Sequence, residues 1–445
     1  MALIAFFAHI NMFVPALLVS LALYIKIRKP CPAPYTFLRT SLLYLVILLI
    51  TDLVLRYKLA SFFIPFCMVP ILTTVLFSNI ELGFILTLAS SLSVAFIFNN
   101  IYVGALFLIS GLCASMLIYG ARRRMEILRV GLIIGIIQSL LLFISTGSEN
   151  PKPVLYIIML ANGIISSVIA LGVLPVFEYL FGTVTNISLL ELADFNHPLL
   201  QKMILNAPGT YHHSLIVGNL SDAACQAVGA NALLARIGAY YHDIGKIEKS
   251  EYFSENQDVE QSKHENLSPT ISKLVIMNHV KDGEELAHKY KLNPRIIGFI
   301  TQHHGNSLVY YFYRRALENL EEDQDIKEEG FRYPGPKPNT KETAVVLLAD
   351  SVEAATRTLK DPTPGKIEEL VHKVINNKFI DGQLDECELT LKDLEKISSV
   401  FIRILGGIYH SRIAYPEKSP TSANNHKKTA KENPRQSDKD KKATA

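Results

Sequence analysis

Residues 83–98 read GFILTLASSLSVAFIF, a run without a single charged side chain. A helix on the surface of a soluble protein needs a polar face, and this stretch has none. Apolar runs of this kind recur before residue 182, and each is long enough to cross a bilayer. They span about 3–25, 37–55, 60–77, 80–98, 101–120, 127–146 and 153–181. Residues 1–181 are therefore predicted to form a transmembrane domain of seven helices.

The composition of the whole chain agrees with a membrane protein. Of its 445 residues, 49% are hydrophobic and only 19% are charged, which excludes a wholly soluble or disordered chain. The five cysteines are scattered and form no CxxC pair, which argues against a disulfide framework or a cysteine-type zinc site. The polar half of the chain is therefore expected in a reducing compartment.

The basic residues of the short loops predict the orientation in the membrane. Lys26, Arg28 and Lys29 follow the first run, and three arginines occupy 122–124. The positive-inside rule places these loops, and with them everything after residue 181, in the cytoplasm, with the N-terminus outside. Arg56 and Lys58 depart from the rule. The predicted location is the bacterial inner membrane, as a multi-pass protein with a cytoplasmic domain.

The first apolar run is expected to stay in the mature protein. No positive residue precedes it and no small-residue cleavage site follows it, unlike a signal peptide. Few ionisable residues lie inside the seven runs, which argues against an ion or proton transporter. The transmembrane domain is therefore expected to act as an anchor or a signal relay.

Amphipathic helical patterns separated by Pro and Gly replace the apolar runs after residue 181 and predict an all-α domain over 182–415. The helices are expected at about 188–205, 212–228, 230–241, 268–281, 294–304, 307–321, 341–359, 363–377 and 391–409, with Gly283 and Gly305 as stops. Residues 416–445 are rich in Lys, Ser, Asn and Pro and are predicted to be a disordered basic tail.

Histidines and aspartates in this domain form the candidate chemical site. A lone histidine on a helix is usually a surface or core residue, but adjacent His-Asp and His-His pairs in apolar helical stretches are costly to bury without a metal. Imidazoles combined with carboxylates suit Mn, Fe or Zn, and a carboxylate can bridge two ions. The candidate ligands are His213, His242, Asp243, His279, His303, His304 and Asp350.

These residues lie in motifs that resemble the HD-domain metallophosphohydrolases. The motifs are YHHS at 211–214, YHDIGK at 241–246, HHG at 303–305 and ADS at 349–351. More narrowly, the chain is similar to the membrane-bound 7TM-HD phosphodiesterases that hydrolyse cyclic di-AMP. That similarity extends to LELADFNHP at 190–198, APGT at 207–210 and FRYPGPKP at 331–338. Many members carry an additional N-terminal helix and a large extracytoplasmic domain, and we expect this sensor domain to be absent here.

The resemblance implies a site for two divalent ions, with Mn or Fe favoured. Residues His213, His242, Asp243 and Asp350 would hold one ion, and residues Asp243, His279, His303 and His304 the other. Asp243 would bridge the two. Neighbouring helical residues point about 100° apart, so only one of His212 and His213 is expected to be a ligand, and the family pattern favours His213.

The implied reaction is hydrolysis of cyclic di-AMP to 5′-pApA by a water molecule that two metal ions activate. Asp243 and Lys246 are the candidate catalytic residues, with Lys246 as a phosphate contact or charge support, unless it is a solvent-facing lysine that ends a helix. Arg332 and Lys337 lie in a loop rich in Pro and Gly that would meet the second phosphate, unless the loop is only a rigid connector.

Other functions remain open at this point. Cyclic di-GMP is the second candidate substrate, but the Gly-Tyr-Pro signature of the HD enzymes that act on it is replaced by GNSLVY at 305–310. Other HD nucleotide phosphohydrolases are soluble, and a non-catalytic nucleotide-binding receptor is the alternative from another class. The expected partners are a cyclic dinucleotide and the lipid bilayer, with no DNA or RNA duplex. A homo-oligomer remains open.

Overall fold

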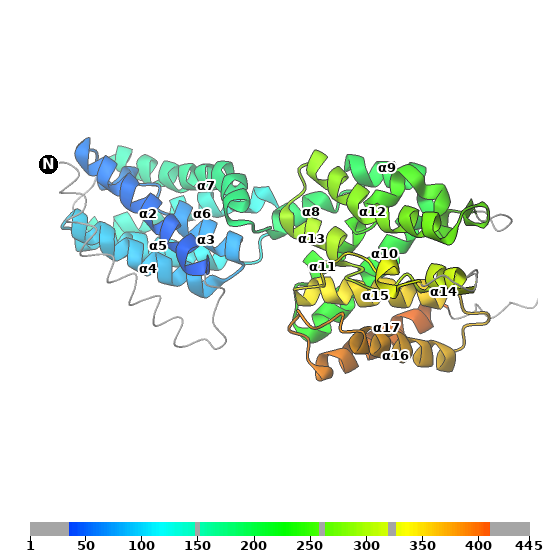
Figure 1. Cartoon of the computed structure of the whole chain (residues 1–445). Helices are drawn as coiled ribbons and strands as arrows, with labels where there is room; N and C mark the ends of the chain where they lie inside the picture. Colours follow the sequence, from blue (N-terminus) through cyan, green and yellow to red (C-terminus); the bar gives the residue numbers. More distant parts are fainter. Residues whose placement is uncertain (1–34, 147–151, 258–262, 319–325, 410–445) are drawn as a thin grey trace, which may run out of the picture.

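The computed structural model of the chain describes residues 35–146, 152–257, 263–318 and 326–409. Across these ranges its regular elements are helices, and one isolated bridge joins Leu308 to Arg332. The all-α prediction is confirmed for this part of the chain. Figure 1 shows the apolar helices gathered at one end of the molecule and the remaining helices at the other. The predicted helix at 3–25, with its expected retention, and the predicted tail lie outside the described residues.

Within the described ranges, five helices are long and apolar enough to cross a membrane. They are α2 (Tyr35–Arg56), α4 (Ile80–Ile97), α5 (Ile101–Ile118), α6 (Arg124–Thr146) and α7 (Pro153–Phe181). One continuous helix over 60–77 was predicted, and this is wrong: a 3-10 turn, η1 (Ser61–Phe63), precedes the short apolar helix α3 (Met68–Phe77). Pro65 lies in the break, where it lacks the backbone N–H that a continuous helix needs.

Small residues let α6 and α7 pack closely. A Cβ atom at Gly163 on α7 would overlap the backbone of Gly131 and Gly135 on α6. In a membrane, where apolar side chains gain nothing by leaving lipid, such close approach stabilises helix pairs through van der Waals contact. The two helices therefore form a tightly packed hairpin whose second arm leads into the polar half of the chain.

The polar half is joined to this hairpin through a short helix, α8 (Asn186–Leu192). α7 ends at Gly182, whose left-handed backbone, with φ at 55°, stops the helix. Arg124, at the start of α6, donates hydrogen bonds of 2.6 and 2.8 Å to the carboxylate of Glu191 on α8. This paired contact connects the end of the apolar bundle to the first helix of the polar half.

The polar half continues with longer helices and short 3-10 turns. They are α9 (Pro198–Asn206), α10 (Pro208–Val228), α11 (Ala232–Tyr241), η2 (Ile244–Tyr252), η3 (Ser254–Asn256), η4 (Lys263–Asn266), α12 (Pro269–Lys289), α13 (Pro294–Gln302), α14 (Tyr310–Glu318), η5 (Glu328–Phe331), α15 (Lys341–Arg357), α16 (Pro364–Ile380) and α17 (Leu391–Ile408). Helix α15 is central, because it packs on α10, α11 and α16 and every residue from Thr343 to Asp350 is buried. Polar residues on its inner turns therefore face protein and not water.

The predicted helix at 188–205 is wrong as a single element. The chain breaks between α8 and α9, where the backbone N–H of Asn196 donates to the side chain of Asp194 at 2.9 Å. Pro198 then starts α9. The first turn of a helix tolerates the missing N–H of proline, whereas the interior of a helix does not.

Of the two glycines that were predicted to stop helices, Gly305 lies just beyond α13 in the left-handed region, with φ at 53°. Gly283 does not stop α12, which continues to Lys289. A Cβ atom at Gly283 would lie against Ile300 and the backbone of Gly245. Gly283 therefore serves close packing inside the helix, which sequence alone does not distinguish from a helix end.

Candidate metal centre

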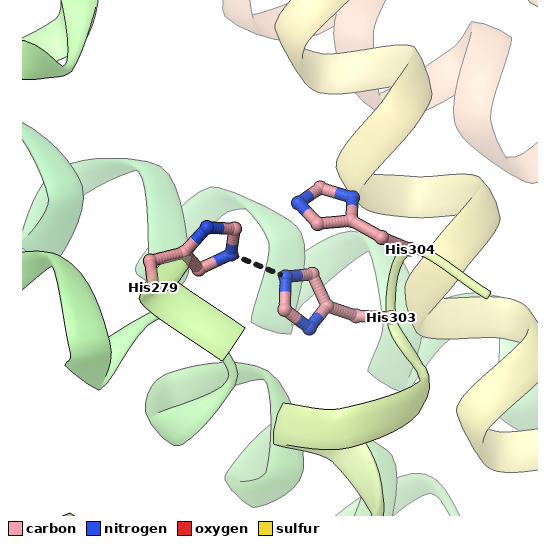
Figure 2. A group of neighbouring side chains, drawn as sticks. All are labelled: His279, His303 and His304. Atoms are coloured by element: carbon pink, nitrogen blue, oxygen red, sulfur yellow. Dashed lines mark hydrogen bonds between the residues drawn. The ribbon is translucent and has the colours of Figure 1, made fainter. Parts of the chain in front are cut away.

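The candidate ligands come from five segments and converge inside the polar half. They are His213 on α10, His242 and Asp243 after α11, His279 on α12, His303 and His304 after α13, and Asp350 on α15. All are buried except His304, which is half-buried. His212, the sequence neighbour of His213, is exposed. Figure 2 shows the rings of His279, His303 and His304 gathered around a common point. Residues far apart in the sequence thus form one cluster of side chains of the kinds that bind metal ions.

The carboxylate of Asp243 lies between two groups of histidines. Its Oδ2 atom lies 3.6 and 3.2 Å from the Nε2 atoms of His213 and His242. Its Oδ1 atom lies 3.3 and 3.5 Å from the Nε2 atoms of His279 and His303. Each oxygen therefore faces a different pair of imidazoles, an arrangement suited to a carboxylate that bridges two cations.

Asp350 and His304 complete the two groups. The Oδ1 atom of Asp350 lies 3.0 Å from His213 Nε2 and 3.8 Å from His242 Nε2. Its Oδ2 atom lies 3.6 Å from His304 Nδ1. Asp350 therefore belongs mainly to the group of His213 and His242, and its second oxygen faces the other group.

Three histidines are held by backbone carbonyls of the preceding helical turn. Their Nδ1 atoms lie against backbone carbonyls three residues earlier, in the pairs His242–Ala239 (2.6 Å), His279–Ile276 (2.5 Å) and His303–Ile300 (2.9 Å). A carbonyl oxygen can only accept a hydrogen bond, so each Nδ1 atom must carry the proton. In its neutral form, each of these rings then carries its lone pair on Nε2, the atom that can bind a metal ion.

The cluster leaves buried polar atoms without hydrogen-bond partners. These atoms are His242 Nε2 and both carboxylate oxygens of Asp243. Lys246 Nζ lies 2.7 Å from Asp243 Oδ2, as an ion pair without hydrogen-bond geometry. The Nε2 atoms of His279 and His303 also face each other at 3.1 Å (Figure 2). Buried charge and facing lone pairs are costly unless a cation compensates them, so the donor set fits divalent metal ions.

The electrostatics of the cluster agree with this fit. Burial disfavours the charged forms, yet the positive charges of His242 and Lys246 hold the pKa of Asp243 well below its usual range. The carboxylates of Asp243 and Asp350 outweigh burial at His242 and raise its pKa to about 10. Burial lowers the pKa of His279 to about 3, so this ring is neutral at physiological pH. The carboxylates thus stay ionised and attract positive charge to the centre of the cluster.

Gly245 brings the two halves of the cluster together. It follows Asp243 in the HDIGK motif, where η2 passes over α12. A Cβ atom at this position would overlap the carbonyl oxygen of His279. Only glycine permits this approach, so the motif places Asp243 within reach of the ligand on α12.

A cavity of about 330 Å³ opens onto the cluster. It is lined by His213, Lys246, Phe253, Ser254, Glu255, Ile276, His279, His304, Tyr333, Asp350, Ala354, Arg357 and Thr358. The cavity therefore combines candidate metal ligands with the cations Lys246 and Arg357 and with aromatic rings, a wall that suits an anionic ligand with flat apolar parts.

Lys246 is half-buried beside Asp243, in the wall of the cavity. Its ammonium also donates to Glu255 at 2.9 Å. The charges of Asp243 and Glu255 raise the pKa of Lys246 above its usual value although burial opposes this. Lys246 is therefore a fixed positive charge at the cavity wall.

Arg332 and Lys337 lie outside the wall of this cavity. Arg332 donates to Glu328 at 2.6 Å and to Asp381 at 2.8 Å, and Lys337 donates to Asp385 at 3.2 Å. Neither is among the described residues that line the cavity. Their loop reaches the site through Tyr333 instead, whose ring stacks on His304 with centroids 4.3 Å apart. The two cations thus hold the loop in place and leave an aromatic residue at the cavity.

The residues at the site that were not predicted from the sequence include Glu255, Tyr333, Glu353 and Arg357. A signal existed for Glu353 and Arg357, which follow Asp350 by three and seven residues on one helix and so share its face. None existed for Glu255, because its contact with Lys246 depends on the path of η3.

Comparison with known proteins assigns the family. A family described as "7TM receptor with intracellular HD hydrolase" matches residues 6–185, and the HD domain family matches residues 210–355. The chain belongs to the family of 7TM receptors with an intracellular HD hydrolase. Two curated relatives of this 7TM-HD protein are named cyclic-di-AMP phosphodiesterase PgpH. The relative from Bacillus subtilis is 45% identical over 324 residues, which are 72% of this chain and 45% of the relative.

The second of these relatives, from Listeria monocytogenes, is 36% identical over 427 residues, which are 92% of this chain and 59% of the relative. The 7TM-HD chain thus spans about half the length of the curated relatives that it matches. A crystal structure of the L. monocytogenes PgpH HD domain in complex with cyclic-di-AMP is 46% identical. The match covers 49% of this chain and 100% of that one, with a TM-score of 0.46.

Proposed function

We propose that this protein is a membrane-anchored, metal-dependent phosphodiesterase that hydrolyses cyclic di-AMP to 5′-pApA. The observation that carries the proposal is the buried carboxylate of Asp243, whose two oxygens face separate pairs of imidazoles and lack hydrogen-bond partners. The names of the relatives from B. subtilis and L. monocytogenes support the reaction and the substrate.

The proposed ligands divide into two groups that share Asp243. One group is His213, His242, Asp243 and Asp350, and the other is Asp243, His279, His303 and His304. Two bound Mn or Fe ions would supply Lewis-acid charge to the phosphate and would activate the attacking water. Every donor in these groups of described residues is nitrogen or oxygen, a set that suits Mn, Fe or Zn, and the family resemblance favours Mn or Fe.

The remaining side chains of the cavity orient and neutralise the substrate. Lys246 and Arg357 place positive charge beside a phosphodiester, and both are held by carboxylates, at 2.9 Å from Glu255 and 2.5 Å from Glu353. Tyr333 offers a flat surface to a base. In the overall reaction, water adds hydroxyl to phosphorus and a proton to the departing 3′ oxygen, so the phosphate stays on the 5′ carbon.

The adenine dinucleotide is preferred to cyclic di-GMP. The segment after His304 reads GNSLVY at 305–310 instead of the Gly-Tyr-Pro signature of the enzymes that act on cyclic di-GMP. In the structure, Asn306 and Ser307 of this segment are engaged by Gln383 and Lys378, at 2.6 and 2.7 Å. The segment thus supports the protein framework, and base recognition is assigned to the cavity wall.

The proposed domain arrangement is a seven-helix transmembrane domain over 1–181, a cytoplasmic HD domain over 182–415 and a disordered tail over 416–445. The five candidate spans and the apolar region 61–77 support this arrangement together with the apolar run at 3–25. Reporter fusions after Gly182 and after Asn150 should report opposite sides of the bacterial inner membrane, with Gly182 in the cytoplasm. A cytoplasmic signal from both fusions would contradict seven helices.

The enzymatic proposal is tested with the full chain in detergent and Mn²⁺. Cyclic di-AMP, cyclic di-GMP and linear pApA are offered separately, and products are resolved by chromatography. We expect cyclic di-AMP to be converted to 5′-pApA faster than the other two substrates react. Faster turnover of cyclic di-GMP would overturn the substrate assignment. Metal binding without turnover of any of them would favour a nucleotide-binding receptor.

A further inference from the structure

His213 is oriented differently from three other histidines of the cluster. His242, His279 and His303 place Nδ1 against a backbone carbonyl of the preceding turn. The Nδ1 atom of His213 lies instead 2.5 Å from the carboxylate oxygen Oε2 of Glu353. The orientation of this one imidazole therefore depends on a side chain and can be changed without altering the backbone.

Glu353 is buried and receives two donors on one oxygen. Its side chain is 2% exposed, and Arg357 Nη2 lies 2.5 Å from the same Oε2 atom. Arg357 Nη2 also lies 3.1 Å from His213 Nδ1. An ionised carboxylate only accepts hydrogen bonds, so the 2.5 Å contact with Glu353 requires the proton on His213 Nδ1, and Arg357 then donates to the same carboxylate oxygen. The proton of neutral His213 is thereby fixed on Nδ1.

This proton position determines what His213 presents to the cluster. With Nδ1 protonated, the lone pair of Nε2 points toward Asp350 and Asp243, whose oxygens lie 3.0 and 3.6 Å away. The other neutral tautomer would place N–H there and remove a metal ligand. A carboxylate that accepts from a ligating histidine also fixes the ring orientation and increases its basicity.

We propose that Glu353 is a positioning residue for one of the two metal ions, and that Arg357 anchors it. The inference rests on the proposed function, since it requires that the cluster binds metal. Glu353 contacts the group of His213, His242 and Asp350 through His213, whereas His279 and His303 are oriented by backbone carbonyls. Loss of Glu353 should therefore weaken one ion selectively.

The experiment measures binding of each ion separately. The full chain in detergent is stripped with a chelator and titrated with Mn²⁺, and bound and paired Mn²⁺ are followed by metal analysis and electron paramagnetic resonance. The variants are Glu353→Ala, Glu353→Gln and the control Glu342→Gln. Glu342 lies on the same helix, about 16 Å away along its axis, and its side chain accepts a backbone hydrogen bond from Asn231.

We expect wild type and Glu342→Gln to bind two ions that give a paired Mn²⁺ signal. Glu353→Ala should bind one ion normally and the other roughly 10- to 100-fold more weakly, so that the signal of isolated Mn²⁺ appears at limiting metal. Glu353→Gln should lose less than Glu353→Ala, because its amide oxygen can still accept from His213 and Arg357.

Three results would overturn the inference. If Glu353→Ala binds both ions as tightly as wild type does, Glu353 has no positioning role while the proposed metal site stands. If both ions are weakened equally in Glu353→Ala and Glu353→Gln, the effect is general loss of structure. If wild type itself binds no Mn²⁺, the proposed function fails, and the inference fails with it.

Discussion

The apolar bundle and the HD domain bury polar side chains of different kinds. In the bundle, the hydroxyls of Thr51, Thr73 and Thr87 donate to carbonyls four residues earlier on their own helices, at 2.7, 2.8 and 2.7 Å. Its buried atoms without partners are single hydroxyl or amide groups, such as Ser90 Oγ. In the HD domain, both oxygens of the Asp243 carboxylate lack hydrogen-bond partners, although Lys246 forms an ion pair with one of them.

The difference concerns charge and not polarity. An unpaired hydroxyl costs on the order of 1–3 kcal/mol, whereas an isolated buried carboxylate costs far more and is retained only with a counter-charge. The bundle therefore accommodates its polar groups by itself. The HD domain collects carboxylates and imidazoles around one point, and Figure 2 shows three of these imidazoles. Such a cluster is stable when cations share that point. The apolar bundle explains how the chain is held in a membrane, and the HD domain explains what the chain does there.

The largest expected effect follows from removing the shared carboxylate. Asp243→Ala should reduce hydrolysis of cyclic di-AMP more than ~100-fold, because both groups of ligands lose their bridging oxygen. Lys246→Ala is the matched variant: it removes a neighbouring charge but no ligand, so part of the rate should remain. Initial rates with Mn²⁺ at saturating substrate measure both. Equal loss of rate in the two variants would show that the Asp243 carboxylate contributes no more than a neighbouring charge does.

A smaller effect is expected from separating the two halves of the cluster. Gly245→Ala introduces a Cβ atom that overlaps the carbonyl oxygen of His279, so η2 and α12 must move apart. We expect a loss of about 1–3 kcal/mol in unfolding free energy, together with weaker metal binding. Thermal unfolding of the full chain measures the first. Gly330→Ala is the control, since nothing lies within 4 Å of a Cβ there, and equal destabilisation by both changes would contradict the close contact.

The smallest effect is expected in the bundle. Asn162 on α7 donates to the carbonyls of Phe62 and Ile64 at 2.8 and 2.7 Å, which connects α7 to η1. Asn162→Leu should cost about 1 kcal/mol, the usual scale for such contacts between membrane helices, and should leave the metal content unchanged. Thr73→Val, which loses only a bond within its own helix, should cost less. Loss of metal in Asn162→Leu would show that packing in the apolar bundle affects the metal centre of the HD domain.

Sequence alone predicts the side chains that form the cluster better than the residues around them. His242 and Asp243, like His303 and His304, are adjacent in the chain, and His213 and Asp350 lie in recognisable motifs. Glu255 could not be predicted, because it meets Lys246 only through the fold of η3. Arg332 was expected at the substrate for its charge, but the acidic groups of Glu328 and Asp381 engage it.

The fold shows the same division between local and long-range information. Apolar runs and proline-initiated helices such as α12 and α13 follow from local sequence. The break near Pro65 is not visible in the local pattern, because the apolar run of 18 residues hides a turn. Gly283 resembles a helix end in the local pattern, because its packing partner, Gly245, lies in a distant segment. Close packing between segments is the information that the local pattern lacks.

The central claim is that the cluster around Asp243 holds two divalent ions. Its most direct test is the metal content of the full chain after equilibration with Mn²⁺ or Fe²⁺ and removal of free metal, for wild type and for Asp243→Ala. We predict two ions per chain in wild type and none in Asp243→Ala. No bound metal in wild type, or two ions retained in Asp243→Ala, would contradict the claim.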